Sequence, residues 1–343
     1  MKILITRPLP GDAADMVRSA MAPAATGLEI DANREDRRLE PDELLDRCRG
    51  CTAILTTPRD RVDAAVLDAA GPTLRIVSNY AVGVDNIDLA ACRERGVLVG
   101  HTPDAVTEPT ADMAWLLILA AGRRAFEGDA LVRSGEWRGV SPKELNGHRL
   151  VDKNLLIVGA GRIGLAVARR ALGWRMRVRY VARTRHPEFE AAPLDAERVE
   201  LDRGLAEADV VSLHTPLTPE TRHLLDRRRL ALMKPTSILV NTARGAVIDE
   251  AALVEALRAG RPGSAGLDVF ENEPRIVEGL AALRNVFLMP HLGSSTHEDR
   301  VWMTRQAVDN LVAALRGEPV PREASGGALA TAAPATPAGS ARP

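Results

Sequence analysis

The sequence predicts an α/β fold with two domains, each built on a parallel β-sheet. The chain has 343 residues, which is more than a single hydrophobic core usually holds. Hydrophobic residues make up 45% of the chain, enough for a sizeable core in each domain. Short apolar, β-branched runs alternate with longer amphipathic stretches along nearly its whole length. This alternation is typical of parallel strands joined by helices.

Ten short apolar runs are the expected strands. Four of them form a first series, at residues 3–6, 53–57, 75–78 and 97–100. Six form a second series, at residues 155–159, 178–182, 210–214, 238–241, 264–269 and 286–289. Between them lie helical stretches such as residues 62–70, 162–174 and 250–259, and Gly260 follows the last of these where a C-terminal glycine is common.

A longer helix is expected at residues 107–124, between the two series of strands. Its apolar residues run nearly all round it, which predicts burial either in a core or between subunits of a homodimer. The end of the chain has a different composition. After Pro321 it consists largely of Ala, Gly, Pro, Ser and Thr, so residues 322–343 are expected to be a disordered tail.

Charge and composition exclude several classes of function. The formal net charge of −1 predicts no attraction to nucleic acid or to an anionic membrane. The chain opens on a strand-like run, and its longest uncharged apolar stretch, residues 113–122, is too short to cross a bilayer. Cytoplasmic localisation is therefore expected. Cys48 and Cys51 form a C-x-x-C, but no second pair or histidine cluster completes a metal site.

A glycine-rich turn follows the strand at residues 155–159. Gly159, Gly161 and Gly164 form a G-x-G-x-x-G between that strand and a helix, which is the context of a dinucleotide-binding turn. Gly159 permits the tight turn, Gly161 lets the backbone approach a pyrophosphate, and Gly164 lets helix and strand pack closely. The start of the helix would then present N–H groups to the phosphates.

The end of the next strand predicts which dinucleotide is bound. NAD-binding turns place an acid there to accept from the ribose 2′-hydroxyl, but this chain has Ala182, then Arg183, Thr184 and Arg185. No carboxylate follows until Glu188. Guanidinium groups suit a 2′-phosphate, so NADP(H) is expected to be preferred, with NAD possible.

Three further segments place polar residues just after predicted strands: residues 241–245, 268–274 and 290–294. Singly, each has an ordinary explanation, with Arg244 in a surface ion pair, Glu273 as a loop acid and His291 as a satisfied core histidine. Together they lie at strand ends downstream of a dinucleotide turn. Because α/β sheets place their chemistry at the carboxyl ends of strands, the three indicate an active site.

At this point the sequence resembles the D-isomer-specific 2-hydroxyacid dehydrogenase family, and within it the glyoxylate/hydroxypyruvate reductases. The resemblance covers about residues 1–321. It rests on the segments at residues 81–88, 159–164, 241–245, 268–274 and 290–294. It implies a Rossmann-like dinucleotide-binding domain at residues 101–291 and a flavodoxin-like substrate-binding domain made of residues 1–100 and 292–321. It also implies an active-site cleft between the domains and a homodimer.

The resemblance also implies roles for individual residues. Arg244 would bind the carbonyl and one carboxylate oxygen of a 2-keto acid. The backbone N–H groups of Val82 and Gly83 would hold the carboxylate, with Asn79 in the same substrate-binding loop. His291 would deliver the proton, and Glu273 would hydrogen-bond the other ring nitrogen of His291, fixing its tautomer and stabilising its charged form.

The cofactor site implied by the resemblance is larger than the glycine turn. Asp268 would orient the nicotinamide carboxamide. The complete expected set is Gly159, Gly161, Arg162, Ile163, Gly164, Ala182, Arg183, Thr184, Arg185, His214, Thr215, Pro216, Thr242, Ala243, Arg244, Asp268, His291 and Gly293.

Comparison within the family narrows the expected substrate. Members acting on phosphorylated substrates carry arginine where this chain has Asn79, and formate dehydrogenases carry glutamine where it has Glu273. Phosphonate (phosphite) dehydrogenases and other D-2-hydroxyacid dehydrogenases keep the arginine, glutamate and histidine and stay open as alternatives. Dinucleotide-sensing corepressors share these residues but usually keep the acid that Ala182 replaces. Reduction of glyoxylate or hydroxypyruvate, to glycolate or D-glycerate, is the expected activity.

Overall fold

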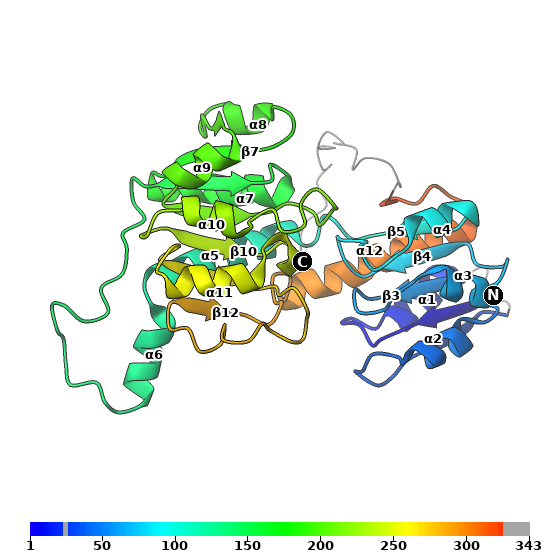
Figure 1. The fold of residues 1–343 in the computed structure, drawn as a ribbon. Coiled ribbons are helices and arrows are strands. Elements are labelled where there is room, and N and C mark those ends of the chain that lie inside the picture. Colours follow the sequence, from blue (N-terminus) through cyan, green and yellow to red (C-terminus); the bar gives the residue numbers. More distant parts are fainter. Residues whose placement is uncertain (23–26, 325–343) are drawn as a thin grey trace. The chain divides into compact units, whose positions relative to one another are not determined.

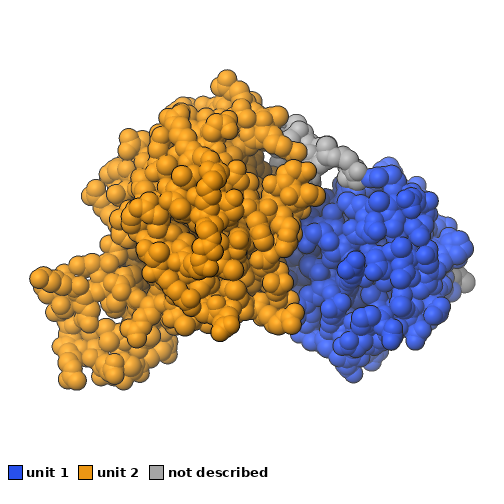
Figure 2. All heavy atoms as spheres, in the orientation of Figure 1, with its two compact units in different colours: residues 1–104, 300–343 blue, residues 105–299 orange. Residues whose placement is uncertain are grey.

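The computed structural model describes residues 1–22 and 27–324, which form two compact units (Figure 1, Figure 2). The first unit consists of residues 1–104 and the described residues from 300 on, and the second of residues 105–299. The expected boundaries were 100/101 and 291/292. The boundary expected after His291 instead lies after Asp299. Residues after His291 stay bonded to the second unit, where the backbone N–H groups of Leu292 and Gly293 donate to Asp268. Most of the expected disordered tail, from residue 325 on, lies outside the described residues. Its first residues are ordered, which corrects the expected start at residue 322: the backbone N–H of Arg322 donates to Asn310 at 3.1 Å and that of Ala324 to the carbonyl of Val99 at 2.7 Å.

The first unit is built on a five-stranded parallel sheet with the strand order β2-β1-β3-β4-β5. Its order reverses between β1 and β3, which is the place where open α/β sheets bind ligands. The strands are β1 (Lys2–Ile5), β2 (Glu29–Ala32), β3 (Ala53–Thr56), β4 (Ile76–Asn79) and β5 (Leu98–Gly100). The helices are α1 (Ala13–Met21), α2 (Pro41–Cys48), α3 (Ala64–Ala70), α4 (Leu89–Glu94) and most of α12 (His297–Arg316).

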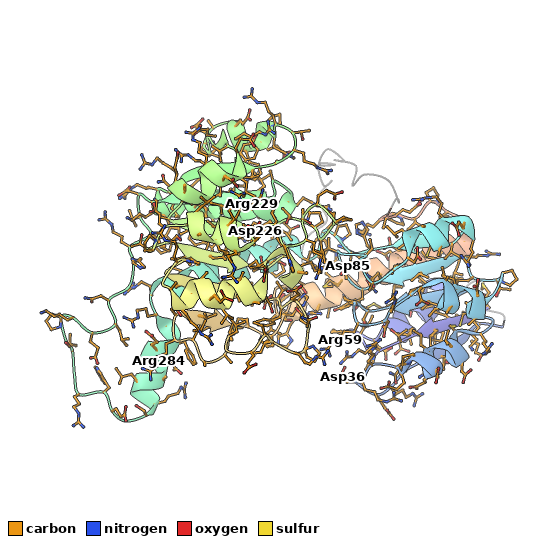
Figure 3. The ribbon with its side chains drawn as sticks, viewed as in Figure 1. Asp36, Arg59, Asp85, Asp226, Arg229 and Arg284 are labelled. Atoms are coloured by element: carbon orange, nitrogen blue, oxygen red, sulfur yellow. The ribbon has the colours of Figure 1, made fainter. Side chains whose placement is uncertain are left out.

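The second unit is built on a seven-stranded parallel sheet with the order β12-β11-β10-β9-β6-β7-β8. Its strands are β6 (Asn154–Val158), β7 (Arg177–Val181), β8 (Glu197–Arg198), β9 (Val210–Leu213), β10 (Ile238–Asn241), β11 (Ser264–Leu267) and β12 (Val286–Leu288). Its helices are α5 (Thr107–Gly122), α6 (Ala125–Arg133), α7 (Arg162–Ala171), α8 (Pro187–Glu190), α9 (Leu201–Glu207), α10 (Arg227–Leu232) and α11 (Glu250–Arg258), with short 3-10 turns at Leu172–Trp174 and Gly245–Val247. Asp226, labelled in Figure 3, begins α10 by accepting from the backbone N–H of Arg229 at 2.8 Å.

The two parallel sheets confirm the predicted fold class. All ten predicted strands are present with ends within about two residues, because β3, β4, β9, β10 and β11 are buried along their full length and so read as apolar runs. Strands β2 and β8 were not predicted from the sequence. These lie at sheet edges, and their polar, partly exposed residues leave no such run.

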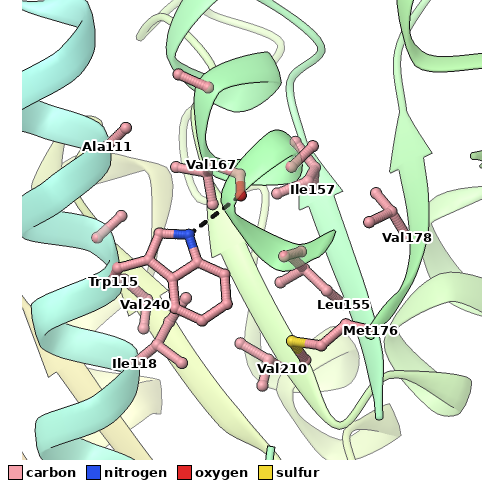
Figure 4. Packing of buried hydrophobic residues seen from close by; sticks show 14 of the residues in the cluster. Ala111, Trp115, Ile118, Leu155, Ile157, Val167, Met176, Val178, Val210 and Val240 are labelled. Atoms are coloured by element: carbon pink, nitrogen blue, oxygen red, sulfur yellow. Dashed lines mark hydrogen bonds between the residues drawn. The ribbon is translucent and has the colours of Figure 1, made fainter. Parts of the chain in front are cut away.

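Helix α5 is covered by its own unit. It packs against α7, β10 and β11, and Trp115 donates from its indole N–H to the carbonyl of Val167 at 3.1 Å (Figure 4). The Trp115 ring also stacks on Trp174 with the centroids 5.8 Å apart. Most of the apolar residues of α5 are therefore buried inside its own unit, although Leu116 is 44% exposed, and the placement of this helix in a dimer interface stays a prediction.

None of the described helices is both long and apolar enough to cross a membrane. Within residues 1–22 and 27–324, no group of three or more His, Cys, Asp or Glu side chains is arranged to hold a metal ion. Cys48 and Cys51 are buried and unpaired. Burial raises the pKa of the Cys51 thiol to about 11, so this thiol stays protonated.

Candidate active site

The glycine turn after β6 has the geometry of a phosphate cradle. Gly159 has φ +105°, and a Cβ there would lie 2.6 Å from the carbonyl of His214, so this position requires glycine. A Cβ on Gly164 would lie 2.3 Å from the carbonyl oxygen of Gly159. At Gly161, by contrast, a Cβ would have no atom within 4 Å. The open space beside Gly161, at the start of α7, is where an anion would meet the free N–H groups of that helix.

The strands next to the cradle supply further polar groups. The sheet order reverses between β6 and β9, which marks the ligand-binding end of such a sheet. Just after β9 and β10, the hydroxyls of Thr215 and Thr242 are buried and have no hydrogen-bond partner among residues 1–22 and 27–324. A buried hydroxyl of this kind calls for a ligand or water. Burial lowers the pKa of His214 to about 3, so its ring is neutral and meets the Ser212 hydroxyl at 2.8 Å. These residues fit a bound dinucleotide.

The turn after β7 differs from its expected arrangement in one respect. Arg183 and Thr184 are exposed there and Ala182 is half-buried. Arg185 instead forms a bidentate ion pair with Glu190, the shortest contact being 2.8 Å. From the sequence, Arg185 was expected to face a ribose phosphate, and the first carboxylate after the turn was Glu188. The pair with Glu190 was not predicted because α8 carries Glu190 back over the turn.

Arg198 is a second basic residue at this turn, and the sequence analysis did not single it out. It lies on β8, beside β7, and its guanidinium donates to the carbonyls of Ala182 and Arg183, both at 3.0 Å. The two bonds fix the backbone of the turn and bring a positive charge to it. In the sequence, Arg198 stands in a short polar stretch with no apolar run, so nothing there indicated that it reaches this turn.

His291 and Glu273 form a hydrogen-bonded pair after β12 and β11. Nδ1 of His291 lies 2.9 Å from Oε2 of Glu273, and 46% and 30% of the two side chains is exposed. His291 has φ +58°, a left-handed conformation that is unfavourable for most side chains. Asp268 holds it there by accepting from the backbone N–H groups of Leu292 and Gly293, each at 2.7 Å. Asp268 therefore positions His291, a role that the sequence analysis did not assign to it.

The carboxylates around this pair have shifted pKa values. Burial acts to raise the pKa of Glu273, but the hydrogen bond and charge of His291 outweigh it, so the net pKa lies below the ordinary value. Asp268 is 1% exposed, and burial raises its pKa despite the two backbone donors. Glu273 is thus held as an anion beside the ring of His291, which suits it to stabilise a protonated imidazole.

The backbone on either side of Arg244 holds this residue close to the loop after β11, which carries Phe270 and Glu273. Asn241, at the end of β10, is 1% exposed and donates to the carbonyl of Arg244 at 2.9 Å. A Cβ on Gly245 would lie 1.8 Å from the carbonyl carbon of Phe270, so only glycine allows this approach. The positive charge of Arg244 contributes to the low pKa of Glu273. The structure therefore gathers Arg244, Glu273 and His291 at the carboxyl ends of β10, β11 and β12.

Glu250, at the start of α11, stabilises the loop that carries Glu271 and Glu273. It is 3% exposed and accepts from the backbone N–H of Glu271 at 2.7 Å, and burial raises its pKa. In the sequence it reads as an ordinary first-turn acid of a helix, which is why it was not singled out.

The expected substrate-binding residues of the first unit lie after β4. Val82 and Gly83 are partly exposed. Asn79 is fully buried and donates to the carbonyl of Gly83 at 2.8 Å. Its side chain therefore contacts the loop itself, and its contact with substrate stays a prediction.

Residues 115–293 match the model of the D-isomer specific 2-hydroxyacid dehydrogenase NAD-binding domain. The chain belongs to the D-isomer-specific 2-hydroxyacid dehydrogenase family. It is 47% identical over 324 residues to the glyoxylate reductase of Thermococcus onnurineus, covering 93% of this chain and 94% of that protein. Among solved structures, the TT0316 protein of Thermus thermophilus has a TM-score of 0.86 and 47% identity, covering 95% and 100% of the two chains. An NADPH-dependent glyoxylate/hydroxypyruvate reductase of Sinorhizobium meliloti, in complex with citrate, has a TM-score of 0.75 and 30% identity, covering 94% and 97%.

This membership identifies the protein as an oxidoreductase that transfers hydride between a nicotinamide dinucleotide and a 2-hydroxyacid or its 2-keto acid. An NAD(P)-binding domain comes with it, in agreement with the glycine cradle and the buried threonine hydroxyls.

Proposed function

We propose that this protein reduces glyoxylate and hydroxypyruvate, to glycolate and D-glycerate, with NADPH as the preferred cofactor. The observation that carries the proposal is the pairing of His291 with Glu273 beside Arg244, in the unit that also holds the phosphate cradle. Proteins named glyoxylate reductase, 42–47% identical to this chain, support this substrate class over other family activities.

The proposed chemistry assigns one task to each side chain. When bound, NADPH would supply the hydride to C2 of the keto acid. Arg244 binds the carbonyl and a carboxylate oxygen with its forked donors and stabilises the negative charge that develops on the carbonyl oxygen. His291 donates a proton to that oxygen. Glu273 keeps the imidazole oriented and stabilises its charged form, while Asp268 holds the backbone that presents it.

Three features of the turn after β7 support NADPH. Ala182 provides no carboxylate to repel a 2′-phosphate. Arg183 is exposed, and Arg198 adds a second positive charge against the backbone of the turn. Arg185 contributes less, because Glu190 already neutralises it. The Sinorhizobium meliloti relative is named NADPH-dependent, in agreement with this preference.

Steady-state kinetics with both NADPH and NADH would test the proposal directly. The substrates are glyoxylate, hydroxypyruvate and pyruvate, and, in separate assays with NADP⁺ or NAD⁺ as the hydride acceptor, phosphite. We expect glyoxylate or hydroxypyruvate to have the highest kcat/KM, in the usual enzyme range of about 10⁴–10⁸ M⁻¹s⁻¹. Preference for phosphite, or no turnover of any 2-keto acid, would overturn it.

Glu273→Gln should move the pH dependence of glyoxylate reduction. Reduction needs a protonated His291, and a neutral amide stabilises the imidazolium less than the carboxylate does. At a given pH the protonated fraction therefore falls, and the alkaline decline of kcat/KM moves to lower pH. A pH profile from about 5 to 10 measures this. An unshifted profile would remove Glu273 from the proton transfer, and Glu271→Gln, on the same loop, serves as the control.

We also propose that the protein is a homodimer that associates through α6 and the chain that follows it. Helix α6 has no buried residue, and residues 134–149 are almost entirely exposed. Large apolar side chains are exposed along this segment: Phe126, Val132, Trp137 and Val140, with exposed fractions of 52, 59, 53 and 95%. A cavity of about 290 Å³, lined in part by Phe126, Arg284 and Phe287, lies beside it. A second copy of the same segment would cover these groups.

Light scattering should therefore give the mass of a dimer at micromolar concentration. Replacing both Val132 and Trp137 with glutamate should produce monomers, because charges would then occupy the apolar surface. Ile276→Glu, which alters an apolar side chain 39% exposed elsewhere in the same unit, should leave the dimer intact. A monomeric parent protein would contradict the proposal.

A further inference from the structure

The loop after β4 has three successive carbonyl groups held by hydrogen bonds. The carbonyl of Ala81 accepts from the backbone N–H of Thr102 at 2.8 Å. The carbonyl of Val82 lies 2.9 Å from Nδ1 of His101, and the carbonyl of Gly83 accepts from the Asn79 amide at 2.8 Å. Since a carbonyl oxygen only accepts, His101 must carry its proton on Nδ1. Three successive peptide groups are thus fixed by three separate donors.

Fixed carbonyls determine where the N–H groups point. In a trans peptide the N–H of the next residue points opposite to the carbonyl. The N–H groups of Val82, Gly83 and Val84 therefore each point away from the donor that holds the carbonyl of the same peptide group. In residues 1–22 and 27–324 none of these N–H groups has a protein acceptor, and all three residues are partly exposed. They form a short run of available donors, which suits an anion.

The Asn79 donor is itself held by a buried network. Asn79 is 0% exposed and also donates to Oδ1 of Asn86 at 3.0 Å. The Asn86 amide in turn donates to the carbonyls of Thr57 and Asp60, at 3.1 and 2.9 Å. This network joins the loop to the end of β3. Because each member is fixed by another, the Asn79 amide has little freedom to release Gly83.

We infer that Asn79 and His101 are positioning residues that preset the backbone of residues 82–84 to bind the carboxylate of the substrate. Neither side chain need touch the substrate. Each holds one carbonyl, and the N–H groups on the far side of the peptides bind the anion without first reorganising, which favours affinity. This inference rests on the proposed function, because the carboxylate is that of the 2-keto acid.

Two pairs of variants test the inference. His101→Leu and Asn79→Asp remove the donors to the carbonyls of Val82 and Gly83. We expect each to raise the KM for glyoxylate and the inhibition constant of oxalate together, by about tenfold or more, the value of one well-placed hydrogen bond. The KM for NADPH should change less than about twofold, the usual measurement scatter of such constants. His101→Asn, whose amide can donate from nearly the same place as Nδ1, should recover most of the loss.

Ser78→Ala is the matched control. Ser78 is also fully buried on β4 and donates to a backbone carbonyl, that of Ala307 at 2.7 Å, but it does not touch the loop. It should lower the thermal midpoint as much as the test variants do and leave both constants near the parent values. Equal rises in the Ser78→Ala variant, or unchanged constants in His101→Leu, would overturn the inference. Should Asn79→Asp not fold, the two His101 variants decide the outcome.

Binding of oxalate to the protein with NADPH, followed by nicotinamide fluorescence, separates this inference from the proposed function. If the parent protein reduces no 2-keto acid, the proposed function fails. Oxalate binding that weakens in His101→Leu and recovers in His101→Asn would still support the preset loop. Oxalate binding that is equal in the parent and in His101→Leu would overturn it, whatever the activity.

Discussion

Replacing His291 with alanine should lower kcat for glyoxylate reduction by about 10²–10⁴-fold, the usual contribution of a positioned acid. The ring is the only group that the proposed mechanism uses to deliver the proton, and it is half-exposed where a substrate can reach it. NADPH binding should persist, because the phosphate cradle lies on other strands. Stopped-flow measurement of NADPH oxidation and a fluorescence titration of NADPH separate the two effects.

A second variant at position 291 separates loss of the acid from loss of stability. His291 has φ +58°, which alanine adopts unfavourably, so His291→Ala can also lose stability. Asparagine tolerates this conformation and has no proton to give near neutral pH. His291→Asn should therefore keep a thermal midpoint near that of the parent and lose kcat to the same extent. If either variant turned over glyoxylate at the parent rate, the proton would come from another group.

The features that the sequence predicted well are those set by local chemistry. Buried parallel strands must be apolar along their length, so β3, β4 and β9 to β11 could be located to within about two residues. A dinucleotide turn needs glycine for steric reasons, which the contacts of Gly159 bear out. His291, Glu273 and Arg244 follow such strands directly, so the sheet alone is enough to bring them to one edge.

The features that were missed depend on segments far apart in the sequence. Glu190 neutralises Arg185 only because α8 turns back. Arg198 reaches the same turn from β8, an edge strand with no apolar run. Asn79 looked like a substrate contact because it lies in the substrate loop, yet it is buried and holds Gly83. A residue's type and position in a motif show which chemistry is available, whereas the direction of its side chain depends on partners that the motif does not contain.

The cofactor preference should respond strongly to changes at the turn after β7. A charge-assisted hydrogen bond contributes about 1.5–3 kcal/mol, and salt partly screens it at these exposed side chains. One or two such bonds to a 2′-phosphate therefore correspond to a preference for NADPH of about tenfold to a few hundredfold in kcat/KM. Arg183→Ala should weaken the use of NADPH by about tenfold or more and leave NADH nearly unchanged. Ala182→Asp should raise the use of NADH, because the new carboxylate can accept from the ribose hydroxyl, and should repel NADPH.

The arrangement of the arginines gives this prediction an internal control. Arg185 forms a bidentate ion pair with Glu190, so its charge is less available to a 2′-phosphate. Arg185→Ala should therefore reduce the use of NADPH much less than Arg183→Ala. Arg198 holds the carbonyls of the turn and adds charge, so Arg198→Ala should resemble Arg183→Ala. Because these side chains are exposed, raising the ionic strength should erode the preference for NADPH in the parent protein. If the parent uses NADH as well as NADPH, or if Arg185→Ala has the largest effect, the 2′-phosphate does not lie between Arg183 and Arg198.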